Sequence, residues 1–172
     1  MSINRWLKVL PGRTDLTGIT SRVSLARNVD GIPFPAKIST IWADELKQRI
    51  ERIYNDYLAS KKYQWIQLDT VCRNTLEDLY FQNLIPPGVL ENPKGCYLVY
   101  LKNNGILLNY GDHIQIFSVI SGFDLNRIYQ DVDKLDNLIE NTIDYAYQND
   151  LGYLTSSIER VGTGMDLSFF IH

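Results

Sequence analysis

An Asn-Gly pair between two β-rich runs is the feature that most restricts the fold of this chain. Residues 96–101 lead into Asn104 and Gly105, and a second apolar run, residues 106–108, follows. Asparagine and glycine both tolerate a positive φ, so this setting predicts a tight β-hairpin. Residues 113–119 alternate between apolar and polar side chains, which indicates another strand. We therefore expect neighbouring strands to pair in an antiparallel sheet.

Apolar residues at helical spacing mark the helices between these strands. Residues 40–58 carry one apolar stripe, and Ser39 or Thr40 is a suitable N-cap. The longest helix is expected over residues 124–148. Such a pattern predicts the α+β class: an antiparallel β-sheet with helices packed on one face. The other expected elements are a short N-terminal helix closed by Trp6 and Leu7, an ordered loop with a short strand over residues 18–35, a helix over 74–83, and strands over 63–68, 153–154 and 167–171.

Composition and charge limit the class of protein. The 172 residues are 45% hydrophobic and 22% charged, which suits one soluble globular domain. A net charge of -3 argues against nucleic acid as a partner, because nucleic-acid-binding proteins usually carry a basic excess. The sequence has no apolar run long enough for a signal peptide or a membrane span. We therefore expect no membrane partner and a cytoplasmic location.

Cys72 and Cys96 are the only cysteines, and the chain has 2 histidines. The cysteines lack the C-x-x-C spacing of a metal site, so no metal ligands are expected. Two buried thiols in a reducing compartment are the favoured interpretation, and a disulfide is the alternative.

Four segments, in order, resemble the motifs of one enzyme family. Residues 20–28 (TSRVSLARN) resemble S-S-R-[VI]-R-L-A-R-N, and residues 109–116 (NYGDHIQI) resemble N-E-E-D-H-[LI]-R-I. Residues 144–156 contain D-Y-A-Y and G-Y-L-T-S, and residues 161–172 begin with V-G-T-G. This set is similar to the ATP:guanido phosphotransferases, and within that family to the catalytic domain of the bacterial protein-arginine kinases (McsB).

The resemblance implies both a fold and a chemistry. The fold would be part of the guanido kinase (glutamine synthetase-like) catalytic domain. We expect residues 1–172 to form a single, shortened domain of this kind, with residues 1–17 as a lead-in and residues 18–172 as the family-like region. Members transfer the γ-phosphoryl group of ATP to a guanidinium nitrogen. Arginines clamp the phosphates, and carboxylates hold the guanidinium and help to take its proton.

Most residues that the resemblance ties to this chemistry are replaced in this chain. The changes affect three arginines, the histidine of the bacterial kinase, the Glu-Glu pair that includes the catalytic glutamate, and the reactive cysteine. We therefore predict that the chain has no catalytic residue. In the same order, the residues now at these positions are Ser24, Gln115 and Asp166, then Asn83, then Tyr110 and Gly111, and finally Ser157.

Ser21, Arg22 and His113 match the family motifs and would be vestigial nucleotide-binding residues. Each also has a structural interpretation. Arg22 suits a structural salt bridge, and a histidine beside a strand is often held by internal hydrogen bonds. The loop at residues 162–164 lacks the arginine that follows it in the family, so it indicates a tight turn. Ser157 has no histidine placed near it by any motif, which argues against a nucleophile.

Free energies indicate what the missing arginines mean. A hydrogen bond to a charged group contributes roughly 1.5–3 kcal/mol, so losing three clamps would cost about 5–9 kcal/mol if the effects were additive. A micromolar ligand binds with only about 8 kcal/mol in total. We therefore expect that ATP does not bind in the family's manner and that the chain holds no cofactor.

Two functions follow from this pattern. The first is a pseudokinase-type protein-binding or regulatory module, whose partner would be a second copy, an active arginine kinase or the adaptor of that kinase. The alternative is a divergent ATP-dependent guanidino or protein-arginine phosphotransferase that uses Mg-ATP and either relies on other residues or is completed by another chain. Residues 167–172 are expected to form a largely apolar strand with an open edge, which in both cases favours a homo-oligomer, a partner strand or a rearranged sheet.

Overall fold

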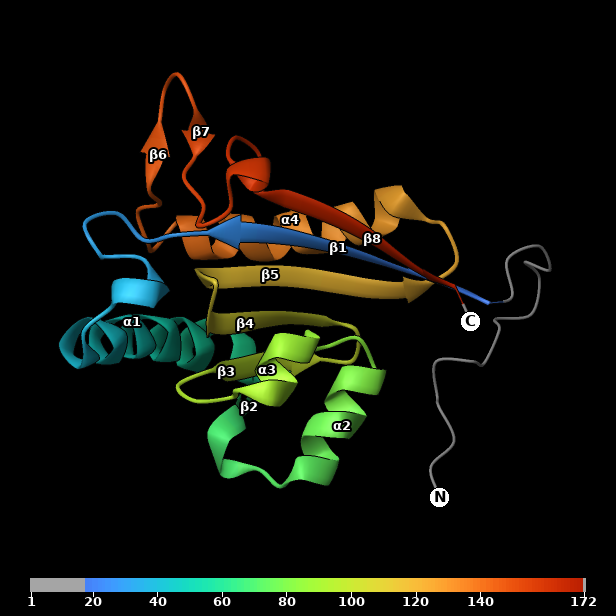
Figure 1. Ribbon diagram of the computed structural model, residues 1–172. Helices are drawn as coiled ribbons and strands as arrows, with labels where there is room; N and C mark the ends of the chain where they lie inside the picture. The colour runs from blue at the N-terminus through green and yellow to red at the C-terminus, as the bar shows by residue number, and fades with distance from the viewer. Residues whose placement is uncertain (1–17, 172) are drawn as a thin grey trace.

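A computed structural model describes residues 18–171 of the chain (Figure 1), and the helix expected at Trp6 and Leu7 lies outside this range. The strands are β1 (Ile19–Arg27), β2 (Gln64–Gln67), β3 (Tyr97–Leu101), β4 (Asn104–Tyr110), β5 (Asp112–Ser121), β6 (Tyr147–Gln148), β7 (Gly152–Tyr153) and β8 (Met165–Ile171). Six of them form one antiparallel sheet in the order β2-β3-β4-β5-β1-β8, and β6 and β7 form a separate hairpin that projects from it.

Two long helices cover one face of the sheet. They are α1 (Thr40–Ile53), which continues as a π-helix over Tyr54–Leu58, and α4 (Leu125–Glu140). Ser39 caps α1 as predicted, because its side chain accepts the Trp42 N–H. The apolar stripes of both helices pack in one core with inward side chains of β1, β3, β4 and β5. The predicted α+β class is confirmed.

Two shorter helices add a second apolar layer on the opposite face, which the sequence pattern did not suggest. They are α2 (Arg73–Phe81) and α3 (Pro87–Glu91), which lie in front of the sheet in Figure 1. Val89 packs there with Leu107 and Phe117, whose strands also bury apolar residues on the α1 and α4 side. Because both faces of β4 and β5 are buried, these strands are apolar on both sides rather than alternating.

The prediction of a loop with a short strand over residues 18–35 was wrong, since β1 is a nine-residue inner strand. It pairs with β5 on one side and with β8 on the other. Ser24 and Arg27 are buried on opposite faces of β1, so polar residues occupy both sides. The two-residue alternation that marks a half-buried strand is therefore absent from its sequence.

The longest predicted helix was too long, because α4 ends at Glu140. The backbone beyond it finds partners in the segment after β1 instead. Asp30 donates to the Asp144 carbonyl at 2.9 Å, and Ala146 donates to the Asn28 carbonyl at 2.7 Å. The apolar stripe of α4 thus continues in the sequence past the point where the helix stops.

The predicted hairpin is confirmed, but its turn lies earlier than the Asn-Gly pair. Leu101 pairs with Asn104 across the turn, and Lys102 has a φ of 56°. Gly105 lies within β4, where a Cβ atom would come within 2.6 Å of Phe117 Cζ. The glycine is required for the close approach of an aromatic ring rather than for the turn.

Candidate functional site

Four predicted site positions share one face of the sheet. Directly paired residues of neighbouring strands point to the same side, and so do residues two apart along a strand. Ser24 pairs with Asp166, and Ala26 pairs with Gln115. Arg22 precedes Ser24 by two residues and therefore points the same way. We call the side of β5, β1 and β8 that carries Arg22, Ser24, Gln115 and Asp166 the altered face.

Arg22 is held on the altered face without a full set of hydrogen bonds. Its Cζ lies 4.8 Å from the centroid of the Phe117 ring, which is a cation–π contact. Its Nη2 is buried and has no hydrogen-bond partner. Burial lowers the pKa of Arg22 to about 10, and the negative charge of Asp166 acts in the opposite direction. The guanidinium is therefore charged at pH 7, and Asp166 is a nearby compensating charge.

The side chains at the other replaced positions of this region pack and form hydrogen bonds inside the protein. Gln115 Nε2 donates to the Tyr110 carbonyl at 2.8 Å, and Ser24 is buried. A Cβ atom at Gly88 would collide with the Tyr110 hydroxyl, so the ring fills the space beside α3. Gly111 has a φ of 69°, which favours glycine. Where the family motif has two carboxylates, this chain has an aromatic ring and a turn.

Asp112, which follows these two residues, is a fully buried carboxylate that joins three segments. Its Oδ1 accepts hydrogen bonds from Asn28 Nδ2 at 2.7 Å and from the Ser156 N–H at 2.6 Å. Its Oδ2 lies 3.0 Å from Arg160 Nη2 in an ion pair, although no well-aligned hydrogen bond forms there. The positive charge of Arg160 is therefore paired with Asp112 and adds little to the altered face.

Two of the predicted vestigial residues are fully buried and hydrogen-bonded internally. His113 Nδ1 accepts the Val29 N–H at 3.1 Å, so its Nε2 carries the proton and donates to the Pro33 carbonyl at 2.9 Å. Burial is the main cause that lowers the pKa of His113. Ser21 donates to the Gly122 carbonyl at 2.5 Å and points to the face opposite the altered face. Neither ring nitrogen of the histidine is free for a ligand.

Asn83 and Ser157 lie outside the sheet, at chain turns. Asn83 has a φ of 57° and donates its N–H to the Tyr80 carbonyl at 2.8 Å, which ends α2 in the left-handed conformation that asparagine tolerates. The Ser157 hydroxyl donates to the Glu159 carboxylate, and this hydrogen bond is the main cause that lowers the pKa of Glu159. A carboxylate of lowered pKa is a weak base, so the arrangement does not activate Ser157 as a nucleophile.

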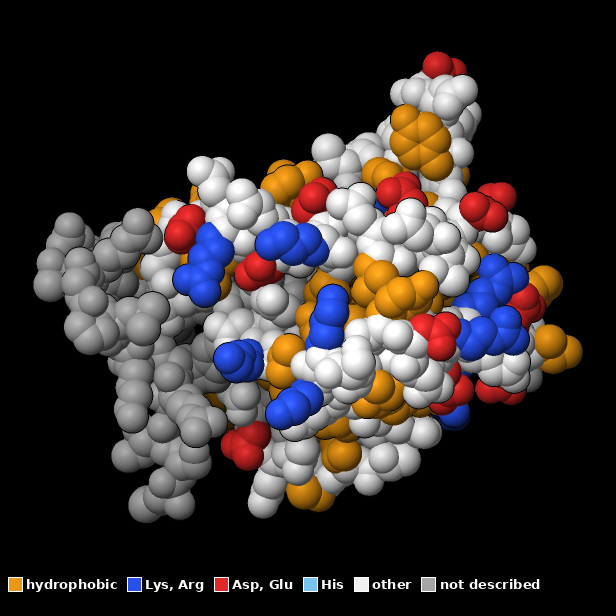
Figure 2. Space-filling model, turned by 180° about the vertical axis from the view of Figure 1, so that it is seen from behind, with side chains coloured by type: hydrophobic (Ala, Val, Ile, Leu, Met, Phe, Trp, Pro, Cys, Tyr) orange, Lys and Arg blue, Asp and Glu red, His pale blue; other side chains and the backbone are white. Residues whose placement is uncertain are grey.

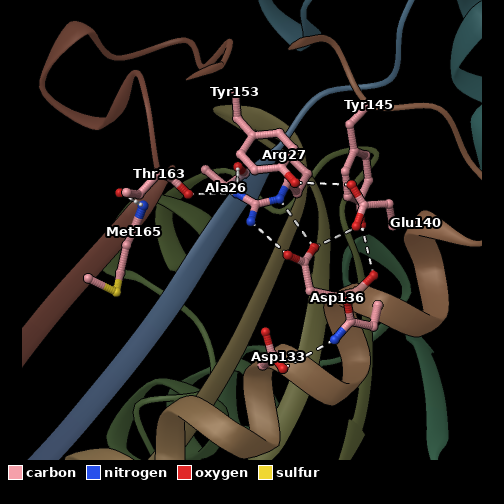
Figure 3. Close-up of polar contacts among 10 residues, drawn as sticks. Ala26, Arg27, Asp133, Asp136, Glu140, Tyr145, Tyr153, Thr163 and Met165 are labelled. Atoms are coloured by element: carbon pink, nitrogen blue, oxygen red, sulfur yellow. Dashed lines mark hydrogen bonds and ion pairs between the residues drawn. The ribbon is translucent and has the colours of Figure 1, made fainter. Parts of the chain in front are cut away.

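A buried ion pair that the sequence patterns did not reveal lies on the other face of β1 (Figure 3). Arg27 Nε and Nη2 donate to the two oxygens of Asp136 at 3.2 and 2.6 Å. Arg27 Nη1 donates to the carbonyls of Ala26 and Thr163 at 3.0 and 2.9 Å. The Tyr145 hydroxyl donates to Asp136 Oδ1 at 3.0 Å. The guanidinium thereby connects β1, α4 and the loop before β8.

Aromatic rings enclose this pair, as Figure 3 shows. The Tyr153 ring lies over the guanidinium, 3.7 Å from Arg27 Cζ, and its hydroxyl donates to Glu140 at 3.0 Å. Burial raises the pKa of Asp136, although the charge of Arg27 opposes this change. Burial likewise raises the pKa of Tyr145 well above its ordinary value. Arg27 is 3% exposed, so the cluster is a structural connection rather than a surface for a ligand.

The sequence did contain a signal for this cluster. Asp136 falls among Val132, Leu135 and Ile139 on the buried side of α4. A carboxylate in an apolar stripe requires a cation or several donors, because an unpaired buried charge is costly. Arg27 is one such cation, and the first motif contains it.

The glycine loop before β8 serves the same ion pair. Gly164 has a φ of 67°, and a Cβ atom at this position would collide with the Ala26 carbonyl oxygen and would also lie 2.6 Å from Arg27 Nη1. The Gly164 N–H donates to the Arg160 carbonyl at 2.9 Å, which closes the turn. The loop is thus a tight turn, as predicted, and its last glycine leaves room for the guanidinium.

Other parts of the described chain offer few binding features. Between residues 18 and 171, no group of three or more His, Cys, Asp or Glu side chains could hold a metal ion. No helix in this range is long and apolar enough to cross a membrane. Cys72 and Cys96 are free thiols, as favoured from the sequence, and Cys96 is buried as expected. The expectation that Cys72 is buried was wrong, because this residue is exposed at the start of α2. Seen from behind, acidic and basic side chains lie interspersed over the surface (Figure 2). A shallow groove there is lined by Glu45, Arg49 and Thr142 among others.

Comparison with known proteins gives a consistent set of matches. Residues 45–172 match the family described as ATP:guanido phosphotransferase, C-terminal catalytic domain. Protein-arginine kinase from Clostridium tetani is 30% identical over 172 residues, which cover 99% of this chain and 50% of that protein. The enzyme from Caldanaerobacter subterraneus is 34% identical over 165 residues, which cover 90% of this chain and 47% of that protein. The chain spans about half the length of the curated relatives that it matches.

Solved structures show the same fold at lower sequence identity. The duplicated taurocyamine kinase from Schistosoma mansoni with bound transition state analog components matches with a TM-score of 0.80 and 22% identity, covering 96% of this chain and 25% of that one. Lombricine kinase matches with a TM-score of 0.76 and 17% identity, covering 96% of this chain and 50% of that one. At these identities the likeness concerns the fold alone.

Proposed function

The chain belongs to the ATP:guanido phosphotransferase family, and on this premise we propose that it keeps the family fold as a protein-binding module and does not itself transfer phosphoryl groups. The observation that carries the proposal is the position of Asp166. Asp166 pairs with Ser24 across the two strands, and its negative charge acts on Arg22. A carboxylate therefore lies on the altered face. By the resemblance, this position would otherwise hold an arginine that binds phosphate.

The altered face carries little net charge, so we expect anions to bind to it only weakly. Arg22 and Asp166 carry opposite charges, while Ser24 and Gln115 are neutral, so these four positions sum to about zero. Two like unit charges 4 Å apart repel by about 1 kcal/mol in bulk water and by about 4 kcal/mol near a protein surface. A triphosphate on this face would meet Asp166 with a repulsion of that order. It would gain at most one guanidinium in return.

Within residues 18–171, the positions that the resemblance assigns to the acceptor side of the reaction hold no exposed proton acceptor. Removal of a proton from a guanidinium requires a carboxylate or a similar base within hydrogen-bond reach. Tyr110 and Gly111 provide none, and Asp112 is fully buried beside Arg160. These contacts support a fold whose remaining charges stabilise the protein rather than bind a substrate.

One observation favours the alternative, a divergent phosphotransferase that uses Mg-ATP and is completed by another chain. Arg22 Nη2 is buried without a hydrogen-bond partner. Such a donor is normally satisfied, because leaving it unpaired costs about 1–3 kcal/mol. An oxygen of a bound anion would supply the missing acceptor.

Calorimetric titration with Mg·ATP separates the two functions. We expect no saturable heat for the wild-type chain. Asp166→Arg should increase affinity for the nucleotide, because it replaces the repelling carboxylate beside Arg22 with a cation. Asp150→Arg makes the same change in net charge on an exposed residue of the β6-β7 hairpin and should have no such effect.

Activity and partner binding complete the test. The chain is incubated with labelled ATP and an arginine-rich acceptor protein, and is also used as bait for active protein-arginine kinase. We expect no acid-labile label on arginine and a stable complex with a protein partner, either this kinase or a second copy of the chain. Tight binding of Mg·ATP to the wild type together with acid-labile label would overturn the proposal in favour of the alternative.

A further inference from the structure

The two edges of the main sheet are built differently. The β2 edge is four residues long, begins and ends with glutamine, and follows Lys61 and Lys62. Short length and edge lysines are devices that prevent an edge strand from pairing with another chain. The β8 edge is seven residues long (MDLSFFI) and contains no lysine, arginine or proline. Within residues 18–171, no strand pairs with the outer side of β8.

Within residues 18–171, the backbone groups of β8 that have no strand partner belong to its apolar residues. Ala26 donates its N–H to the Gly164 carbonyl at 2.7 Å, so these residues form a hydrogen-bonded pair just before β8. Hydrogen-bonded and non-hydrogen-bonded pairs alternate along an antiparallel ladder. Asp166, Ser168 and Phe170 therefore direct their backbone groups toward β1. The residues that direct theirs toward the open edge are Met165, Leu167, Phe169 and Ile171.

The same four residues form an exposed apolar row on the α4 side of the sheet. Met165, Leu167 and Phe169 are 43%, 41% and 42% exposed, and Ile171 is 84% exposed. Phe123, itself 45% exposed, stacks on Phe169 with ring centroids 4.7 Å apart. Aromatic side chains bury roughly 150–250 Å² each when fully covered. At about 100 Å² of exposed surface from each of these five residues, two copies together offer on the order of 1,000 Å², which is the size that a specific interface needs.

We propose that β8 pairs antiparallel with β8 of a second copy, about a two-fold axis at Ser168. The inference rests on the proposed function, because it names the partner of the protein-binding module. In this register Leu167 lies opposite Phe169 of the second copy, and Met165 lies opposite Ile171. All seven residues of each strand then pair, and the two sheets become one continuous sheet across the dimer.

The charge on β8 favours this register. Asp166 lies opposite Phe170 of the second copy, four residues from the other Asp166, or roughly 13 Å along the strand. A two-fold axis at Asp166 would instead bring the two carboxylates face to face, which is destabilising. The surface is self-complementary, as the interface of a two-fold dimer requires.

Disulfide trapping tests the register directly. With exposed Cys72 changed to serine, Ser168→Cys places two thiols at the axis as a non-hydrogen-bonded pair. Cα atoms in such a pair are about 4.5 Å apart, within the range of about 4.4–6.8 Å that a disulfide spans. We expect rapid formation of covalent dimer. Asp166→Cys alone should not cross-link, but an equal mixture of Asp166→Cys and Phe170→Cys chains should.

Sedimentation measures the association itself. The wild type should sediment as a dimer, and Leu167→Lys should shift it to a monomer by placing a charge at the edge. Ile158→Lys, at a residue that is 90% exposed on another surface, is the matched control and should remain a dimer. Circular dichroism checks that Leu167→Lys is folded. If this variant is unfolded, the disulfide-trapping experiment tests the strand pairing instead.

A wild-type monomer would overturn the second copy as partner, and equal cross-linking of Ser168→Cys and Asp166→Cys chains would overturn the pairing about Ser168. If such a monomer still formed a complex with the active kinase, the proposed function would stand without this inference. Acid-labile labelling of arginine by a trapped dimer would overturn the proposed function and leave the strand pairing intact.

Discussion

Arg22 and Arg27 lie on the same strand, five residues apart and on opposite faces, and their surroundings differ sharply. Arg27 makes a two-pronged ion pair, donates to two backbone carbonyls and stacks under Tyr153. Arg22 rests on Phe117 with a buried Nη2 that has no partner. Both belong to the same family-like motif. The contrast indicates that Arg27 connects neighbouring elements of the fold, whereas Arg22 lies on the altered face with a donor that no internal group satisfies.

The largest effect is expected from Arg27→Met. It leaves Asp136 as a buried carboxylate with only the Tyr145 hydroxyl as partner, and loss of one partner of a buried pair typically costs about 3–5 kcal/mol. Urea unfolding should show a loss of stability of this size. Adding Asp136→Leu removes the unpaired buried carboxylate and should recover part of the lost stability. A loss below about 1 kcal/mol for the single variant would mean that the ion pair does not hold this region together.

Gly164→Ala changes the surroundings of Arg27, and its effect on the free energy of unfolding should lie between those of the two arginine substitutions. An alanine there must adopt a positive φ, and its Cβ would also collide with the Ala26 carbonyl oxygen and lie 2.6 Å from Arg27 Nη1. Gly31→Ala is the matched control, since Gly31 has a φ of 73° and no atom within 4 Å of the added Cβ. Both variants should lose about 1–2 kcal/mol to the backbone. Gly164→Ala should lose about 1–3 kcal/mol more from crowding. Equal losses in thermal unfolding would contradict the close packing of β1, at Ala26 and Arg27, against Gly164.

The smallest effect is expected from Arg22→Met. The substitution keeps a flexible apolar contact with Phe117 and removes a buried donor that has no acceptor. Unfolding in urea should show no change or a gain of up to about 1 kcal/mol. A loss of about 2 kcal/mol or more would show that Arg22 has a structural role comparable to that of Arg27, and the contrast between the two faces would fail.

Much of the fold follows from local patterns in the sequence. The cap at Ser39, the apolar stripe of α1 and the hairpin near residue 103 depend on neighbouring residues, and these predictions are confirmed. The errors concern segments whose structure depends on distant partners. β1 has no alternation because both of its faces are buried, and α4 ends where the backbone of residues 144–146 pairs with residues 28–30.

In the candidate site, too, the sequence predicted which positions matter better than it predicted their contacts with distant residues. Motif likeness selected Arg22, Ser24, Gln115 and Asp166, and the strand register places all four on one face. The same likeness selected His113 and Ser21, whose side chains are held by internal hydrogen bonds. Motifs mark positions in a chain, but they do not state which side of a strand a residue occupies. The partner of Arg27 was missed because it is 109 residues away in sequence.

The position of β1 between β5 and β8 also affects how the chain folds. The strands β2, β3, β4 and β5 are neighbours in both sequence and space, so this meander can form from short-range contacts. β1 must wait for β5, more than 80 residues later, and for β8 near residue 170. Because non-local pairing slows folding, we expect β1 to dock after β5 has formed, and β8, whose strand partner is β1, to dock after it. During synthesis on a ribosome, β1 would then remain without its strand partner until residues 112–121 have been made.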